Sequence, residues 1–477
     1  MRGIISHSGY LPFRRLDRTT IASVAGGAGG KGTRTVASYD EDTTTMAVEA
    51  GRLALRSAGS ARPASLWLAT TAPAYADKTN ATAVHAALRL DADVVAADAA
   101  GAVRSAVAVM RLALEGSQPS LVIGADARTG LPGGADELTG GDGASAVLVG
   151  DETDGPIVAE FLGAAGVTEE FLDRWRAPGS LRSKVWEERF GEEHYVAAGE
   201  RAWMAALKRS DIAAEDVSHL VVTGLHGRAV ASLAKRLAGP DTSVANTLDT
   251  TVGNTGAAHP SLLLSSVLES AAPGQTVALV TLADGADVLM FRTTPALARF
   301  TPARTIADQV LAGAPIAYGK FLSWTGMLPV EPPRRPEPAR VSATAASRSV
   351  DWKFGFAGTR DTATGTIRMP PAVAGADPAA TLETMPMAEV AGTVVTFTVD
   401  RLAYSPSPPV VFAVIDFDGG GRLPVELTDV DPDGVQIGDR VEMTFRRLST
   451  ADGIHNYFWK ARPIRGEGRR SVRGQEA

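Results

Sequence analysis

A turn from strand to helix is predicted in the stretch Ala96-Ala97-Asp98-Ala99-Ala100-Gly101-Ala102-Val103-Arg104-Ser105-Ala106. The run Asp93-Val94-Val95 before it predicts a short strand, and the apolar residues up to about Glu115 predict a helix. A strand that turns abruptly into a helix leaves its first side chain facing unpaired N–H groups and the positive end of the helix dipole. We therefore expect Asp98 to occupy a site that suits a nucleophile or an anion.

The composition limits the class of protein. The 477 residues are enough for roughly two to four domains, and the net charge of −7 argues against general affinity for nucleic acid or anionic membranes. The sequence lacks an apolar run of about 18 residues and a signal-peptide core, so we expect a cytoplasmic protein without a membrane span. It also lacks cysteine, which excludes disulfides, thiolate metal sites and thiol catalysis.

Strands and helices alternate through residues 1–155, which predicts an α/β architecture with a buried sheet. The helix that follows Ser38 begins with Asp40, Glu41 and Asp42, as expected where capping groups start a helix. The other predicted elements are strands at Gly3–Pro12, Ser65–Thr71, Leu121–Gly124 and Gly141–Gly150 and a helix at Asn80–Leu90.

Residues 156–295 repeat this order. Asp142-Gly143-Ala144 and Asp284-Gly285-Ala286 each introduce an apolar strand at the end of their half, so we predict an internal duplication. The predicted elements are helices at His194–Arg209, Arg228–Leu237 and Ser261–Ser270 and strands at Asp216–Gly224 and Val277–Val280.

The remaining residues change character. Five prolines between Pro329 and Pro338 predict that residues 296–350 are a linker or helical connection. Residues 351–377 hold few apolar positions, and residues 378–463 show five alternating strands that predict a small OB-fold barrel. Residues 464–477 form a basic tail that we expect to be disordered.

Four motifs carry a resemblance to a known family: Gly9–Pro12, Tyr39–Ala50, Gly141–Ala144 and Gly253-Asn254-Thr255-Gly256. Through them, residues 1–325 resemble the 3-hydroxy-3-methylglutaryl-CoA (HMG-CoA) synthase and ketoacyl synthase III branch of the thiolase superfamily. The resemblance implies an α/β fold with a duplicated thiolase-like αβαβα core, followed by the OB-fold barrel.

Residues 350–463 resemble the zinc-ribbon and OB-fold module that accompanies such thiolases. Trp352–Phe356, Gly365-Thr366 and Pro370-Pro371 carry this second match. The positions near those expected for ribbon cysteines hold other residues, namely Asp361, Thr364 and Ala374. We therefore predict a degenerate ribbon without a metal.

The family's chemistry uses a cysteine nucleophile, a glutamate acid/base and a histidine that orients the acyl carbonyl. The resemblance aligns these positions with Asp98, Thr71 and Thr223. Of the catalytic set, Asn254 alone remains. Residues of the acyl-transfer mechanism are thus replaced, whereas the glycines and apolar strands of the scaffold are kept.

Each candidate site residue has two interpretations. Asp98 is either a helix cap or a carboxylate that acts as a base or holds a substrate hydroxyl. His226 and His259 are either loop histidines or catalytic bases, and Tyr75 is either a core residue or an acid/base. Asn254 either tolerates a left-handed backbone or binds a thioester or enolate oxygen through its amide.

Two functions stay open. The first is an enzyme that acts on a coenzyme A thioester without a cysteine nucleophile, by aldol or retro-aldol chemistry or a related acyl transfer. The second is a catalytically inactive scaffold that binds acyl-CoA or a pathway partner. Binding of nucleic acid by the barrel is disfavoured, because its strands carry no basic-aromatic cluster. We expect no tightly bound cofactor, a homodimer through the thiolase-like core, and an OB-fold domain that closes the acyl channel.

Overall fold

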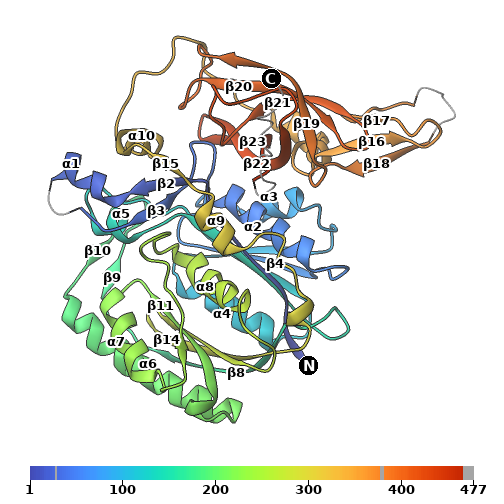
Figure 1. Cartoon of the computed structure of the whole chain (residues 1–477). Coiled ribbons are helices and arrows are strands. Elements are labelled where there is room, and N and C mark those ends of the chain that lie inside the picture. Colours follow the sequence, from blue (N-terminus) through green and yellow to red (C-terminus); the bar gives the residue numbers. More distant parts are fainter. Residues whose placement is uncertain (27–28, 376–380, 466–477) are drawn as a thin grey trace, which may run out of the picture. The chain divides into compact units, whose positions relative to one another are not determined.

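Ten strands of residues 1–330 form one sheet, drawn in Figure 1. The strands of the first half are β1 (Arg2–Tyr10), β4 (Ser65–Thr70), β5 (Val95–Ala100), β6 (Ser120–Asp126) and β7 (Gly143–Asp151). Those of the second half are β8 (Ala159–Thr168), β11 (Val217–Gly224), β12 (Ser243–Val244), β13 (Thr276–Leu282) and β14 (Gly285–Thr293). The computed structural model describes residues 1–26, 29–375 and 381–465, so most of the predicted basic tail lies outside the described residues.

The two halves of the sheet have the same topology. Outward from its centre, the first half runs β1-β7-β6-β4-β5 and the second runs β8-β14-β13-β11-β12. In each half the two inner pairings are antiparallel and the two outer pairings are parallel. This correspondence confirms the predicted duplication.

Helices cover the sheet in layers. The main helices are α2 (Thr43–Ser57), α3 (Ala81–Ala87), α4 (Arg104–Glu115), α6 (Glu188–Ser210), α7 (Gly227–Leu237) and α8 (His259–Leu268). Val277 and Leu279 of β13 share a core with α4 and α8, whereas Ala278 and Val280 share a core with α6 and α7. Because alternate residues of a strand point to opposite faces, α4 and α8 form a middle layer, and α6 and α7 an outer one. The α/β fold class with an αβαβα core is confirmed.

The start of α2 shows how the sequence dictates an element. The Asp42 carboxylate accepts a hydrogen bond from Thr45 N at 2.9 Å, and Asp42 N donates to Thr45 Oγ1 at 2.8 Å. This reciprocal pair is a capping box, which satisfies N–H groups that the first helical turn leaves unpaired. The predicted capped helix therefore begins at Thr43.

The strand-to-helix turn lies further along the chain than predicted. The strand continues through Ala100, because Val95–Ala100 pairs in parallel with Ser65–Thr70 of β4. The chain turns at Gly101, whose φ of +112° suits glycine, and α4 begins at Arg104 with Val103 as its N-cap. Parallel pairing thus overrides the helix propensity of an alanine-rich stretch. The predicted placement of Asp98 at the helix mouth is wrong, since Asp98 lies within the strand.

Residues 296–330 are folded onto the first unit. The segment forms α9 (Ile306–Leu311), β15 (Ala314–Ile316) and α10 (Tyr318–Trp324). The side chain of Gln309 donates to Gly9 O at 2.8 Å, and β15 pairs with β2 (Arg14–Asp17), which also pairs with β3 (Thr33–Val36). Of the two predicted alternatives, this part is a helical connection with one short strand and not an extended linker. Elements of three to seven residues leave no readable period in the sequence, so their bounds could not be predicted. The proline-rich residues follow, at the boundary between the units.

The second unit, residues 331–477, contains the predicted barrel. Its closed sheet has the order β19-β20-β21-β23-β22, formed by β19 (Gly392–Asp400), β20 (Val410–Phe417), β21 (Arg422–Leu427), β22 (Arg440–Ala451) and β23 (Ile454–Pro463). A three-stranded sheet precedes it, built from β16 (Ala357–Asp361), β17 (Ile367–Arg368) and β18 (Leu382–Pro386). Asp361 closes a turn there by accepting from Ala363 N and Thr364 N.

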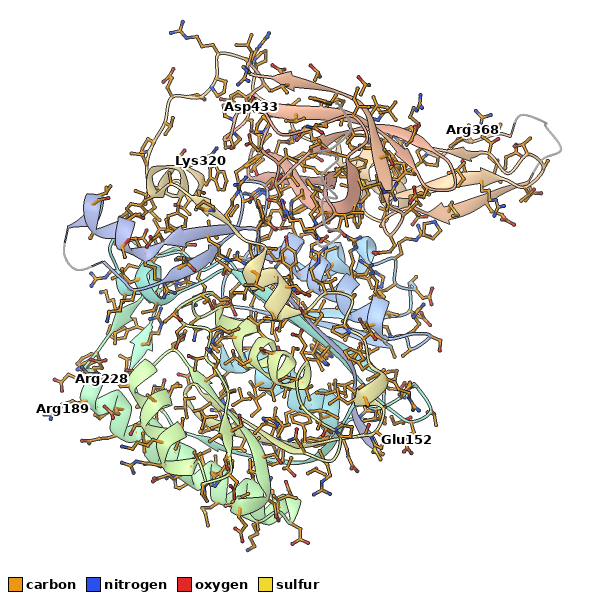
Figure 2. All side chains as sticks on the ribbon, viewed as in Figure 1. Glu152, Arg189, Arg228, Lys320, Arg368 and Asp433 are labelled. Atoms are coloured by element: carbon orange, nitrogen blue, oxygen red, sulfur yellow. The ribbon has the colours of Figure 1, made fainter. Side chains whose placement is uncertain are left out.

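The described ranges contain no group of three or more His, Cys, Asp and Glu side chains that could hold a metal ion. None of their helices is long and apolar enough to cross a membrane. Charged side chains such as Arg189, Arg228 and Asp433 lie on the surface of the units (Figure 2).

Candidate functional site

A cavity of about 220 Å³ lies where the two halves of the first unit meet. Of the predicted site residues, Thr223, Asn254 and His259 line it, whereas Asp98, His226, Thr71 and Tyr75 do not. The structure therefore brings together three of the seven candidates. All three come from the second half of the duplicated core.

Asn254 is fixed in the turn that follows β12. Its Nδ2 donates to Gly224 O at 3.0 Å, and its Oδ1 accepts from Gly256 N at 2.9 Å. The left-handed conformations of the turn fall on Gly253, with φ +86°, and Gly256, with φ +60°. The interpretation that Asn254 takes the left-handed backbone is therefore wrong. One of its two amide N–H groups is used by Gly224, and the side chain lines the cavity.

His259 is a buried, neutral histidine at the start of α8. Burial lowers the pKa of His259 to about 4, so its ring is uncharged at neutral pH. Thr255 N donates to Nδ1 at 3.3 Å, which makes this nitrogen the unprotonated one. Thr223, at the end of β11, is only 2% exposed and lines the cavity.

His226 is a helix cap. Its Nδ1 accepts from Ala229 N at 3.1 Å at the start of α7, and its Nε2 lies 2.8 Å from Glu188 O. Since Nδ1 accepts, the proton is on Nε2 and donates to the carbonyl. Both ring nitrogens are occupied, and the side chain does not line the cavity. The prediction of a catalytic base at this residue is not supported by its geometry.

Asp98 caps a helix other than the one expected. Its Oδ2 accepts from Asn80 N at 2.7 Å and from Asn80 Nδ2 at 2.9 Å, and its Oδ1 accepts from Ala81 N at 2.8 Å. These bonds hold the start of α3, and Asn80 also bonds the backbone of Tyr75. Asp98 is therefore a helix cap, as one interpretation expected, but the helix that it caps is α3 and not α4. At the mouth of α4 the side chain is that of Val103, which has neither a nucleophilic nor a titratable atom.

Thr71 is held by a buried carboxylate. Thr71 N and Thr71 Oγ1 donate to the two oxygens of Asp126, at 2.7 and 2.8 Å. Asp126 also accepts from Thr70 Oγ1 at 2.9 Å and from Ala257 N at 2.8 Å, so it joins both halves of the core. Four donors on a fully buried carboxylate make Asp126 a structural anchor beside the cavity.

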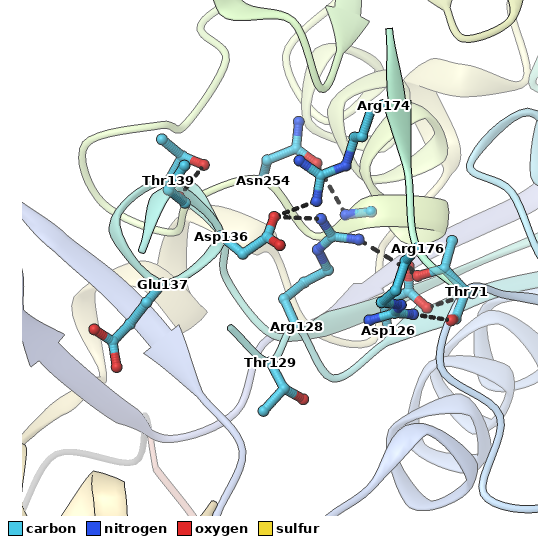
Figure 3. A network of polar contacts seen from close by, with 12 residues as sticks. Thr71, Asp126, Arg128, Thr129, Asp136, Glu137, Thr139, Arg174, Arg176 and Asn254 are labelled. Atoms are coloured by element: carbon cyan, nitrogen blue, oxygen red, sulfur yellow. Dashed lines mark hydrogen bonds and ion pairs between the residues drawn. The ribbon is translucent and has the colours of Figure 1, made fainter. Parts of the chain in front are cut away.

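Sequence reasoning missed a cluster of arginines beside Thr71, shown in Figure 3. Arg128 Nη1 lies 3.4 Å from Thr71 Oγ1, and Arg128 Nη2 lies 3.5 Å from Asp136 Oδ1. Asp136, on α5 (Ala135–Thr139), is also bonded by Arg174 of β9 (Arg174–Trp175). No motif signals this cluster, because its members come from four separate segments of the chain.

The charges of the cluster are strongly perturbed by burial. Burial lowers the pKa of Arg128 below its usual value, although Asp126 and Asp136 oppose the shift. Burial by itself would raise the pKa of Asp136, but Arg174 and then Arg128 bring it below the usual range. Asp136 is therefore ionised at neutral pH and is shared by two guanidinium groups.

Comparison with known proteins supports the assignment of both units. Residues 207–289 match the family model described as 3-oxoacyl-[acyl-carrier-protein] synthase III C terminal, and residues 386–446 match the ChsH2 C-terminal OB-fold domain. The HMG-CoA synthase of Methanocaldococcus jannaschii is 29% identical over 301 residues, which cover 60% of this chain and 86% of that enzyme. The HMG-CoA synthase of Methanopyrus kandleri is 27% identical over 337 residues, which cover 67% and 95%.

Solved structures show the same fold. An HMG-CoA synthase complexed with CoA aligns with a TM-score of 0.58 and 17% identity, over 67% of this chain and 89% of that one. The 3-oxoacyl-(acyl carrier protein) synthase III of Pseudomonas aeruginosa aligns with a TM-score of 0.54 and 24% identity, over 62% and 98%. The first unit thus has a thiolase-like fold and is similar in sequence to HMG-CoA synthases and to the C-terminal part of 3-oxoacyl-[acyl-carrier-protein] synthase III, and the second unit carries an OB-fold module.

Proposed function

We propose that this chain binds a coenzyme A thioester in the cavity of its thiolase-like core and does not transfer the acyl group through the protein. This is the second of the two functions that the sequence left open. The observation that carries it is the replacement of all three reactive groups. Asp98 stands where the resemblance places cysteine and caps α3, Thr71 is bonded to Asp126, and Thr223 stands where the resemblance places histidine.

The ligand class follows from the relatives. The curated relatives are HMG-CoA synthases, and two of the structural neighbours are complexes with CoA and with 3-hydroxy-3-methylglutaryl coenzyme A. A fold kept without its reactive groups retains the shape of a binding site while losing the nucleophile.

Retro-aldol cleavage is the second candidate function. One observation favours it, because His259 is neutral and lines the cavity together with Asn254, so an imidazole and an amide meet in one site. A group with a pKa of about 4 is a weak base, and its Nδ1 already accepts from Thr255 N. The bases that the sequence favoured, Asp98 and His226, are both engaged in caps.

We also propose that the first unit forms a homodimer. β5 is the last strand of the sheet and pairs with β4 on one edge. Val95 on this strand is 62% exposed. An uncovered strand edge offers backbone donors and acceptors to a second strand. Sedimentation of the purified chain at twice the monomer mass would support the dimer, and a monomer at all concentrations would contradict it.

The OB-fold module is proposed to close the acyl channel. A test is cross-linking of the acidic side chains of residues 331–477 to the lysines of residues 1–330, with and without acyl-CoA. Cross-links that change in yield when acyl-CoA is added support the proposal. Cross-links that are insensitive to the ligand contradict it.

The main experiment separates binding from chemistry. The purified chain is titrated calorimetrically with acetyl-CoA and with a panel of β-hydroxyacyl-CoA thioesters. The same mixtures are assayed for released aldehyde, ketone and CoA thiol. We expect saturable binding and no product. Product release that Asp98→Ala, His226→Ala or His259→Gln reduces would overturn the proposal in favour of the lyase.

A further inference from the structure

The hydrogen-bond donors of the buried Arg128 guanidinium are poorly satisfied. Its side chain is 9% exposed, and its two protein contacts, at 3.4 and 3.5 Å, are at the outer limit of a hydrogen bond. Its Nε has no hydrogen-bond partner among the described residues. A guanidinium offers five donors in a planar fork, and a buried cation is costly unless it is paired. Because Nε has almost no accessible surface, a ligand in the cavity that Arg128 lines would accept from the two Nη groups, whose present contacts are long.

A second arginine of the cavity shows the same deficit. Arg18 is 5% exposed and donates to backbone carbonyls, with Asp249 O at 2.5 Å and Thr139 O at 3.5 Å. Its Nε also lacks a partner within the described ranges. Neutral carbonyl oxygens satisfy donors but do not neutralise a charge. Arg18 and Arg128 are therefore two buried cations whose donors are not all used.

The cavity carries an excess of positive charge. Three guanidinium groups line it, from Arg18, Arg128 and Arg174, and two carboxylates, from Asp136 and Asp249. Asp249 is exposed to solvent, and its Oδ2 accepts from Thr247 Oγ1 at 2.7 Å, but its charge still acts on Arg18, whose pKa it raises against the effect of burial. The buried Asp126, which does not line the cavity, and Asp136 both oppose the lowering of the pKa of Arg128 by burial, so the excess concerns only the side chains that line the cavity. An anion entering the cavity would restore the balance.

We infer that the cavity is a receptor for a carboxylate, with Arg128 as its main ligand and Arg18 and Arg174 as supporting cations. The inference rests on the proposed function and names the class of its ligand. A planar carboxylate matches the guanidinium fork and can accept from two donors at once. A volume of about 220 Å³ suits a short acyl chain that ends in such a group. The carboxylate comes from the far end of a dicarboxylic acyl thioester or from a free dicarboxylate.

The test compares two thioesters that differ at one end of the acyl chain. Glutaryl-CoA ends in a carboxylate, whereas pentanoyl-CoA of the same length ends in a methyl group. We expect the wild-type chain to bind glutaryl-CoA roughly tenfold to a hundredfold more tightly in calorimetric titrations, the gain from one buried charge-assisted pair. Equal affinity for the two thioesters would overturn the inference and leave the proposed function standing.

Variants assign the effect to its residue. Arg128→Met should remove the preference for glutaryl-CoA and keep the affinity for pentanoyl-CoA within about twofold. Arg128→Lys keeps the charge without the fork and should restore only part of the preference. The matched control is Arg176→Met, because Arg176 donates to Thr71 O at 2.7 Å nearby but is exposed and does not line the cavity. Retention of the preference in Arg128→Met would overturn the inference.

Competition separates the sources of the carboxylate. Displacement of glutaryl-CoA by free glutarate assigns the site to free dicarboxylates as well, and failure of glutarate to compete assigns it to the acyl chain. Binding of glutarate without binding of either thioester would support the carboxylate receptor and contradict the proposed function. Displacement by inorganic phosphate as effective as that by glutarate would overturn the choice of a carboxylate.

Discussion

Replacing Arg128 by methionine should stabilise the ligand-free protein. The substitution removes two contacts at 3.4 and 3.5 Å, each worth at most about 0.5–1 kcal/mol at that length. It also removes the desolvation penalty of a buried cation, which is several kcal/mol. Asp136 keeps Arg174, and Asp126 keeps its four neutral donors but loses the charge of Arg128, which offsets part of that gain. We expect a net gain of about 1–3 kcal/mol in the free energy of unfolding.

The assay is urea unfolding of wild-type and variant chains, followed by tryptophan fluorescence. The matched control is Arg34→Met, because Arg34 is fully buried, pairs with Asp142 Oδ1 at 3.1 Å and bonds Arg128 O at 2.9 Å. Loss of this well-satisfied arginine should cost about 3–5 kcal/mol. If Arg128→Met destabilises the chain as much as the control does, Arg128 is a structural residue and the reasoning is refuted.

Four further predictions follow from the same geometry. Asp126→Asn should lower the free energy of unfolding in urea by about 2–4 kcal/mol, because the side chain of Asn cannot accept from all four donors. An unchanged unfolding midpoint would contradict the role of Asp126 as a structural anchor. Burial lowers the pKa of His7 to about 3 from 6.5, so stability is lost as pH falls from 6.5 towards 3, by about 1.4 kcal/mol at pH 5.5. His7→Phe should therefore raise Tm more at pH 5.5 than at pH 8, and an equal change at both would refute this. Burial raises the pKa of Glu269 to about 7 from 4.5, so its protonated form stabilises the fold below pH 4.5 and this contribution is lost as pH rises to 7. Glu269→Gln should therefore flatten the dependence of Tm on pH between pH 5 and 8. A dependence of Tm on pH that is the same as in the wild type would contradict the shift. Val103→Cys places a thiol at the N-terminus of α4. After incubation with acetyl-CoA, the intact mass of this variant should rise by one acyl group. An unmodified thiol would show that the N-terminus of α4 does not face the thioester.

The fold could be predicted because its signals are local. Asp42 and Thr45 lie three residues apart, so a capping box is readable in the sequence, and the alternating strands of the barrel are visible as a period of two. The duplication was readable from the order of elements alone. The sequence around Asp98 does not predict the strand, because a run of alanines shows no alternation of apolar and polar residues. The pairing of Asp98 with Leu68 of β4 is a tertiary contact that the local sequence does not show.

The site could be predicted only in part, because its contacts are distant in sequence. Asn254 was found through its glycine-flanked turn, which is a local motif. The surroundings that make Arg128 a candidate are Asp136, Arg174 and Thr71, and Thr71 is separated from Arg128 by 57 residues of sequence. His226 was correctly placed at the end of a strand, but the carbonyl of Glu188 that occupies its Nε2 comes from a different helix. Such pairings depend on packing and leave no pattern along the chain.

The central claim is that the cavity binds a thioester and does not react with it. The most direct measurement is the intact mass of the protein after incubation with a saturating concentration of glutaryl-CoA, together with the free CoA thiol in the same sample. We predict an unchanged mass and no CoA release under conditions where calorimetry shows the site to be filled. An acyl adduct on the chain, or release of CoA with turnover, would contradict the claim.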